Sequence, residues 1–229
     1  MIKLIIFDLD DTLVDHKVGA EAALKAVIDL MIKADYIPAT YDSKPFVNAY
    51  HKKNLRLWSE FTTGRITIDK LLEERFDYIS NWFETDVKIK EELKKCYWDC
   101  YTANCPLTAD WTPLLKKLKN SFSLAICSNG SQEVQIRKLK YNNIIDFFDG
   151  LYFGTRQPEC KPFENFFRGI IDDFNLKAEE VLMVGDSLDN DIIPCSKIGM
   201  QVLLYKSESY YEEIKECIIK MTGIKNVTI

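Results

Sequence analysis

The N-terminal stretch MIKLIIFDLDDTLVDH places several carboxylates directly after a short apolar run. Asp8 and Asp10 are two residues apart, and side chains at this spacing lie on the same side of a strand. Neighbouring carboxylates at the end of a buried strand repel one another and lose hydration, so they need a compensating cation. No basic residue stands beside them in the sequence. We therefore expect the compensation to come from distant residues, from a metal ion, or from both.

Two later segments carry groups that complement this acidic pair. In FSLAICSNG, Ser128 and the backbone N–H groups of Asn129 and Gly130 are suited to bind an anionic oxygen where a helix begins. The same serine is equally suited to cap that helix. In ECKPFENFF, Lys161 precedes Pro162, a residue that favours the first turn of a helix. An isolated lysine is usually solvated, but this one follows a predicted strand by a short loop and is placed to neutralise the carboxylates.

The segment VLMVGDSLDNDI adds three more acids, Asp186, Asp189 and Asp191, after another apolar run. Taken singly, Asp186 and Asp189 are typical of turn and cap residues. That interpretation does not explain why acids recur at the same end of two predicted strands, which would need a divalent cation between them. Oxygen ligands without clustered His or Cys favour Mg²⁺ over zinc. The sequence therefore predicts a magnesium site where the two acidic segments meet.

Short apolar runs that alternate with helical patterns would position these residues. The predicted strands occupy residues 3–7, 122–127, 150–154, 181–185 and 201–205, and the predicted helices occupy 131–142, 162–174, 189–197 and about 208–220. This alternation predicts a parallel sheet with helices on both faces. Because parallel crossovers are nearly always right-handed, a Rossmann-like, doubly wound α/β fold is the economical arrangement.

Residues 16–105 contain no convincing strand. Amphipathic patterns predict helices over residues 18–34 and near 44–60, 67–83 and 86–102. A helical block of this length is too long for one crossover. We therefore expect a helical subdomain inserted after the first strand, with residues 1–15 and 106–229 forming the core.

The strings DLDDT, CSNG, KP and GDSLDND, in this order and at these strand ends, resemble the four motifs of the haloacid dehalogenase superfamily of hydrolases. The resemblance covers the whole core, and the inserted block resembles the helical cap of that superfamily. It implies that Asp8 is the nucleophile and forms an aspartyl-phosphate, and that Asp10 protonates the leaving oxygen and then deprotonates water. Because Asp10 is present at the second acidic position, the resemblance points to phosphate esters and away from dehalogenation.

The resemblance also implies the remaining roles at the site. Asp8, the main-chain carbonyl of Asp10 and Asp186 would hold Mg²⁺. The phosphate group would be bound by Ser128, Asn129 and Lys161, of which Ser128 and Lys161 stabilise its charge. Asp191 would support the site by orienting Lys161 or a metal-bound water.

These implications predict a magnesium-dependent phosphomonoesterase that acts on small phosphorylated metabolites. The stretch LWSEFTTGRITIDKLLEERF (57–76) resembles the cap of the nucleotidase and acylneuraminate-phosphatase branch, which favours 5′-nucleotides first and sugar phosphates second. Three tryptophans, Trp58, Trp82 and Trp98, either stack on a base or fill the core of the inserted helices, and the second interpretation is favoured. A sugar phosphomutase remains an alternative, as does a phosphate-accepting signalling module.

Composition limits the partners and the compartment. The 229 residues carry a formal net charge of −5, with Lys and Arg scattered along the chain. This balance gives no support to binding of nucleic-acid polymers or anionic membranes. Seven cysteines without a CxxC pair are typical of reduced thiols, and neither a signal peptide nor a membrane-spanning run is apparent. We expect a cytoplasmic monomer or homodimer.

Overall fold

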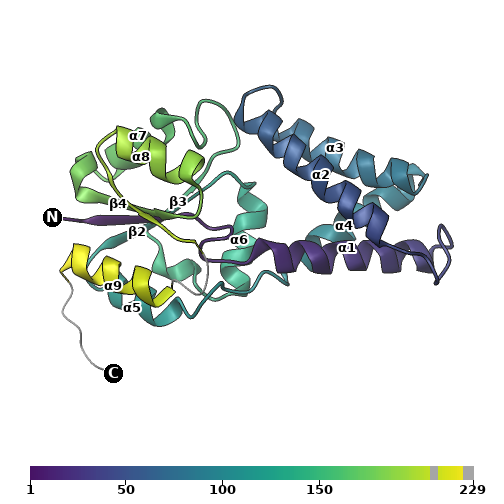
Figure 1. Ribbon diagram of the computed structural model, residues 1–229, viewed down its shortest axis with the longest axis horizontal. Helices are drawn as coiled ribbons and strands as arrows, with labels where there is room; N and C mark the ends of the chain where they lie inside the picture. Colours follow the sequence, from purple (N-terminus) through teal and green to yellow (C-terminus); the bar gives the residue numbers. More distant parts are fainter. Residues whose placement is uncertain (207–210, 224–229) are drawn as a thin grey trace. The chain divides into compact units, whose positions relative to one another are not determined.

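The computed structural model describes residues 1–206 and 211–223, and the chain divides into two compact units (Figure 1). The core unit consists of residues 1–15 together with the chain from residue 106 onward. The helical unit consists of residues 16–105.

The core unit is built on one five-stranded sheet in the order β3-β2-β1-β4-β5. All neighbouring strands are parallel, and the strands are β1 (Leu4–Phe7), β2 (Ser123–Ser128), β3 (Gly150–Phe153), β4 (Val181–Gly185) and β5 (Gln201–Leu204). In this order the first strand lies at the centre, and the chain winds outward from it in both directions. The predicted doubly wound α/β fold is confirmed.

Helices cover both faces of this sheet. Figure 1 shows α7 (Glu164–Asp173) and α8 (Ile193–Lys197) on one face, and α5 (Thr112–Lys119) and α9 (Tyr211–Thr222) on the other. The core unit also contains α6 (Gln132–Tyr141), two 3₁₀ helices, η1 (Ile145–Phe147) and η2 (Ala178–Glu180), and a π-helical turn, η3 (Leu188–Ile192).

Apolar side chains on both sides of the central strands explain why the sheet is buried. Leu4 and Ile6 of β1 pack into one cluster with the α7 residues Phe167 and Ile170. On the opposite face the ring of Phe7 meets the ring of Trp111 at 6.0 Å between centroids. A strand that is buried on both faces has a continuous apolar run as its sequence. The carboxyl edge of the strands is then the natural place for a ligand.

Two predicted helices differ from the structure at their N-terminal ends. The helix predicted from residue 162 begins at Glu164, because Phe163 is extended and caps it, which leaves Pro162 outside. The helix predicted over 189–197 is a π-helical turn, η3, followed by the short α8. Pro194 has no N–H for a regular bond to the preceding turn, which is consistent with this change of pitch.

The helices α5 and α9 compare differently with the sequence prediction. The helix α5 was not predicted, because eight residues with Pro113 near the start give a weak periodic signal. Its apolar residues Leu114, Leu115 and Leu118 are nevertheless buried. The last helix was predicted from about residue 208, a start that lies outside the described residues, and α9 is described from Tyr211.

The helical unit contains α1 (His16–Lys33), α2 (Lys44–Thr62), α3 (Ile68–Trp82) and α4 (Val87–Thr102). Its interior is rich in aromatic rings, and Tyr50 of α2 donates its hydroxyl to the hydroxyl of Tyr97 of α4 at 2.9 Å. Trp98 packs edge-on against Phe76 at 5.6 Å between ring centroids. No helix within the described residues has the length and apolarity needed to cross a bilayer.

Candidate active site

The candidate site residues gather at the carboxyl edge of the parallel sheet. Asp8 follows β1 directly, Ser128 is the last residue of β2, and Asp186 follows β4. These strands are neighbours, and the backbone N–H of Asp8 donates to the carbonyl of Val184 at 2.9 Å. Lys161 comes from the segment between β3 and α7. The strand register thus brings groups that are far apart in the sequence to one edge.

Lys161 lies between two carboxylates. Its side chain is 5% exposed, and its Nζ donates to Asp8 Oδ1 at 2.5 Å and to Asp191 Oδ1 at 2.6 Å. Burial alone would lower the pKa of Lys161, but the charges of Asp191 and Asp8 raise this pKa well above its ordinary value. Lys161 is therefore a fixed cation within the acidic site.

The side chain of Asn129 holds the backbone of Lys161. Its Nδ2 donates to the Lys161 carbonyl at 2.7 Å, and the Lys161 N–H donates to its Oδ1 at 2.8 Å. This pairing ties the end of β2 to the segment that carries the lysine. The sequence assigned Asn129 to phosphate binding. With its side chain engaged in this way, the backbone N–H of Asn129 is the group that remains a candidate for that role.

The two oxygens of Asp8 have different surroundings. Oδ1 accepts from Lys161, whereas Oδ2 is buried and no donor among residues 1–206 and 211–223 reaches it. Burial raises the pKa of Asp8 to about 8; the charge of Lys161 opposes this shift, and the charges of Asp191 and Asp186 reinforce it. A buried carboxylate oxygen without a partner is costly. Oδ2 therefore needs a cation or a ligand donor.

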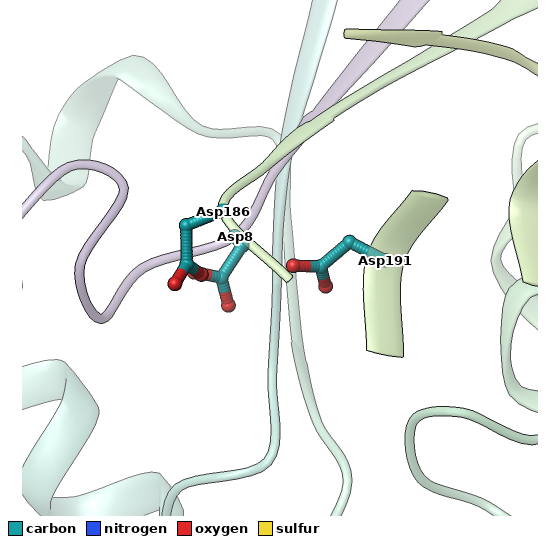
Figure 2. A group of neighbouring side chains, drawn as sticks. All are labelled: Asp8, Asp186 and Asp191. Carbon is teal, nitrogen blue, oxygen red and sulfur yellow. The ribbon is translucent and has the colours of Figure 1, made fainter. Parts of the chain in front are cut away.

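Asp8, Asp186 and Asp191 form the acidic cluster of the site. Figure 2 shows their carboxylates turned toward one another, and the candidate ligand atoms lie within 4.8 Å of one another. Both oxygens of Asp191 are already engaged, one by Lys161 and the other by the N–H of Ser187 at 3.0 Å. Asp8 and Asp186 thus fit a small divalent cation, since such ions prefer oxygen ligands. Asp191 is instead paired with Lys161.

Burial also raises the pKa of Asp186, to about 6. The charge of Asp191 adds to this shift, and the charge of Lys161 opposes it. The third acid of the same segment, Asp189, is exposed and lies outside the cluster. Position after a strand therefore does not by itself bring an aspartate into the site.

Ser128 does not cap the following helix. That helix, α6, begins at Gln132 with Ser131 before it. The buried hydroxyl of Ser128 instead accepts from Gln135 Nε2 at 2.6 Å and from the N–H of Gly130 at 3.3 Å. Of the two interpretations of Ser128, the capping one is wrong, and its hydroxyl lies among the polar groups of the site.

Asp10 is held apart from the acidic cluster by two residues that sequence reasoning missed. Lys138 Nζ donates to Asp10 Oδ1 at 2.6 Å, and Gln135 Nε2 donates to Asp10 Oδ2 at 2.7 Å. Both donors lie on α6 and are buried. The signal that would have revealed them is a polar pair at i and i+3 on the face of α6 that also buries Leu139.

Comparison with known proteins agrees with this geometry. Residues 2–199 match the family described as haloacid dehalogenase-like hydrolase. The glyceraldehyde 3-phosphate phosphatase of Pyrococcus furiosus is 30% identical over 92% of this chain and 83% of its own length. The N-acylneuraminate-9-phosphatase of Rattus norvegicus is 24% identical over 91% of this chain and 84% of its own.

Solved structures show the same fold. The HAD-hydrolase YfnB from Bacillus subtilis, bound to magnesium, superposes with a TM-score of 0.72 at 22% identity. The alignment covers 94% of this chain and 99% of that one. The resemblance inferred from the four sequence motifs is confirmed. The match over residues 2–199, on a chain that brings the acidic cluster and Lys161 together at the carboxyl edge of its sheet, shows that this protein is an enzyme of the haloacid dehalogenase-like hydrolase family.

Proposed function

We propose that this hydrolase is a magnesium-dependent phosphomonoesterase that acts on small phosphorylated metabolites through an aspartyl-phosphate on Asp8. The main support for the proposal is the difference between the surroundings of the Asp8 carboxylate and those of the Asp10 carboxylate. Asp8 is buried, with Lys161 at Oδ1 and no donor from the described part of the chain at Oδ2, whereas Asp10 is held by different donors and is 30% exposed. Two carboxylates in such different surroundings suit two different roles.

In the first half of the reaction, one oxygen of Asp8 attacks phosphorus and the bond from phosphorus to the leaving oxygen breaks. Asp10 donates a proton to that oxygen, so the alcohol leaves neutral. Lys161 and the hydroxyl of Ser128 stabilise charge on the phosphoryl oxygens, which is where most catalysis of phosphoryl transfer arises.

In the second half, Asp10 takes a proton from water as the water oxygen attacks phosphorus. The bond between phosphorus and Asp8 breaks, and inorganic phosphate and the free carboxylate are regenerated. A magnesium ion held by Asp8, the main-chain carbonyl of Asp10 and Asp186 would supply positive charge that offsets the carboxylates and the phosphoryl group.

The names of known relatives support the proposed substrate class. Relatives named for glyceraldehyde 3-phosphate and for an acylneuraminate 9-phosphate support a small phosphorylated metabolite. A relative named as a pyrimidine 5′-nucleotidase supports nucleotides as well, whereas Trp58 and Trp98 pack against Phe61 and Phe76 and add no support for base stacking. We therefore place sugar phosphates and nucleotides in one panel, with the helical unit as the cap that selects between them.

The test is release of inorganic phosphate from a panel of esters with Mg²⁺ or with chelator. The panel contains glyceraldehyde 3-phosphate, hexose phosphates, 5′-nucleotides and p-nitrophenyl phosphate, and Asp8→Asn is the control. We expect magnesium-dependent release from at least one metabolite, with none from Asp8→Asn. If no ester is hydrolysed faster by the wild type than by this variant, the proposal fails.

The same assay separates the two alternatives. A phosphomutase would form an isomer of a sugar phosphate with little free phosphate. A signalling module would retain one phosphoryl group per chain after incubation with a phosphate donor. Continuous release of phosphate over many turnovers is expected here.

A further inference from the structure

We propose that Lys138 and Gln135 are positioning residues that hold the Asp10 carboxylate in the orientation required for proton transfer to the leaving oxygen. This inference rests on the proposed phosphatase function and adds to it two residues outside the four motifs. Both residues lie on α6, one helical turn apart.

Each oxygen of Asp10 has its own donor. Lys138 Nζ lies 2.6 Å from Oδ1, and Gln135 Nε2 lies 2.7 Å from Oδ2. Two donors on opposite oxygens fix the rotation of a carboxylate as well as its position. Because proton transfer depends on a heavy-atom separation within hydrogen-bond reach, a fixed carboxylate is more effective than a mobile one.

The two donors are more deeply buried than the carboxylate that they contact. The Lys138 side chain is 1% exposed, whereas that of Asp10 is 30% exposed. Gln135 is fully buried. A surface helix normally directs a lysine head to solvent, and a buried ammonium is tolerated only with a fixed acceptor. Lys138 and Gln135 are therefore buried donors, and the Asp10 carboxylate that they hold is itself partly exposed.

Gln135 also connects Asp10 to the phosphate-binding side of the site. The same Nε2 that donates to Asp10 donates to Ser128 Oγ at 2.6 Å. Gly130 makes room for it, since a Cβ at Gly130 would lie 2.2 Å from that nitrogen. One amide therefore sets the position of the proton donor relative to a group proposed to bind phosphate.

A merely structural ion pair would have a different kinetic signature. Loss of such a pair would lower the rate for every substrate alike. Loss of Asp10 orientation matters most when the leaving oxygen is strongly basic, because that oxygen needs its proton as the bond breaks. An alkyl phosphate such as glycerol 3-phosphate has a basic leaving oxygen, whereas p-nitrophenyl phosphate has a weakly basic one.

The experiment compares kcat/KM for these two esters in the Mg²⁺-loaded full chain. We expect Lys138→Met to lower kcat/KM for glycerol 3-phosphate by roughly 100-fold. For p-nitrophenyl phosphate we expect about threefold, and Lys138→Arg should restore most of the loss. Gln135→Met should show the same selective loss, which keeps the test informative if Lys138→Met folds poorly. The control is Lys140→Met, an exposed lysine of the same helix, which should match the wild type.

Equal losses for the two esters in both variants would overturn the positioning role and leave the proposed phosphatase function intact. A gain in activity on the alkyl ester would also overturn it, because the contacts would then hold Asp10 away from the leaving oxygen. If the wild type releases phosphate from no ester at all, the proposed function fails first and this inference falls with it.

Discussion

At the scale of single residues, the site depends on Lys161 as the internal cation of a group of acids. Its Nζ contacts Asp8 and Asp191 at 2.5 and 2.6 Å, and all three side chains are almost fully buried. Removing one member of a buried ionic group leaves the others uncompensated, which costs more than the intact group contributes to folding. The lysine thus has a structural role as well as the proposed catalytic one.

Lys161→Met is expected to lower the free energy of unfolding of the metal-free protein by roughly 3 kcal/mol. Phosphate release should be lost as well, because the phosphoryl oxygens lose a cation. Urea unfolding in the presence of chelator measures the first effect. Lys116→Met, at an exposed position of α5, should stay within about 0.5 kcal/mol of the wild type. A loss for Lys161→Met no larger than that of the control would show that Lys161 does not compensate the acids.

Magnesium binding is expected to depend on Asp186 and on pH. Because the pKa of Asp186 is raised to about 6, protons compete with the metal for this carboxylate as pH falls through that value. Calorimetric titration should therefore show weaker Mg²⁺ binding at pH 5 than at pH 8, and at least tenfold weaker binding in Asp186→Asn at pH 8. Chelation of the wild type should abolish phosphate release, and added Mg²⁺ should restore it.

The exposed neighbour Asp189 provides the matched control for that titration. Asp189→Asn removes one negative charge from the same segment without touching the cluster. It should bind Mg²⁺ like the wild type. If the two variants bind equally, net charge rather than ligation explains the metal affinity.

Sequence reasoning located the strand-end acids, Ser128 and Lys161, because these residues follow recognisable apolar runs. It missed Gln135 and Lys138, whose importance depends on the face that α6 turns inward. The backbone N–H of Asn129 stays a predicted phosphate donor, but no feature of the sequence indicated that its side chain would bind the backbone of Lys161. Contacts of this kind depend on how loops close in space, which strand and helix periodicity does not encode.

At the scale of elements, the π-helical turn η3 carries Asp191 back toward the strand end. Asp191 lies so close to β4 that a Cβ at Gly185 would lie 2.5 Å from its Oδ2. The same oxygen accepts from the N–H of Ser187 at 3.0 Å. The glycine at the end of β4 is therefore required by close approach, and the turn after it delivers the partner of Lys161.

Gly185→Ala is expected to displace Asp191 and to destabilise the protein by about 1–3 kcal/mol, with a loss of phosphate release. Gly169→Ala is the control: it lies in α7, and no atom of the described residues lies within 4 Å of the added methyl group. That control should be stabilised by about 0.5–1 kcal/mol, as for other glycines inside helices. Thermal or urea unfolding of both variants checks the prediction, and a Gly185→Ala protein as stable and active as the wild type would contradict it.

Asp149 joins α5 to the sheet. It accepts from Lys119 Nζ at 2.5 Å and from the N–H of Leu124 at 3.0 Å. Partial burial would raise the pKa of Asp149, but these hydrogen bonds outweigh it and the pKa lies below its ordinary value. A depressed carboxyl pKa contributes stability above the unfolded-state value near 4, and this contribution is lost as pH falls through the lower folded-state value.

We therefore expect Asp149→Asn to be less stable than the wild type at pH 7. The difference should shrink as the solution is acidified below about pH 4, where the wild-type carboxyl takes up its proton. Urea unfolding of both proteins at pH 7 and pH 3 measures the two differences. A difference that stays constant with pH would mean that the ionised carboxylate contributes nothing, and that only the hydrogen-bond geometry matters.

The elements themselves were predictable where packing is simple. All five strands were located to within about a residue, because strands buried on both faces produce continuous apolar runs. The helix α5 was missed, and α7 began two residues later than predicted. Short helices and helix starts depend on caps and prolines, whose effect on one or two residues is not visible in the apolar period.

At the scale of the whole molecule, a parallel sheet with its first strand at the centre brings distant motifs to one edge. The confirmed α/β fold follows from alternating strand and helix patterns, and the four motifs gave the resemblance that the family match over residues 2–199 confirmed. The chain divides between residues 15 and 16 and between residues 105 and 106. The sequence did not specify the substrate, because the four motifs concern the phosphoryl group and the metal and not the rest of the ester.

The central claim is that Asp8 carries the phosphoryl group during turnover, and the most direct test is to trap it. The full chain with Mg²⁺ and a hydrolysed ester is quenched in acid during turnover, digested and examined by mass spectrometry. We expect one added phosphoryl group on the peptide containing Asp8, present in the wild type and absent in Asp8→Asn. A phosphoryl group found only on another residue, or normal turnover by Asp8→Asn, would show that Asp8 is not the nucleophile.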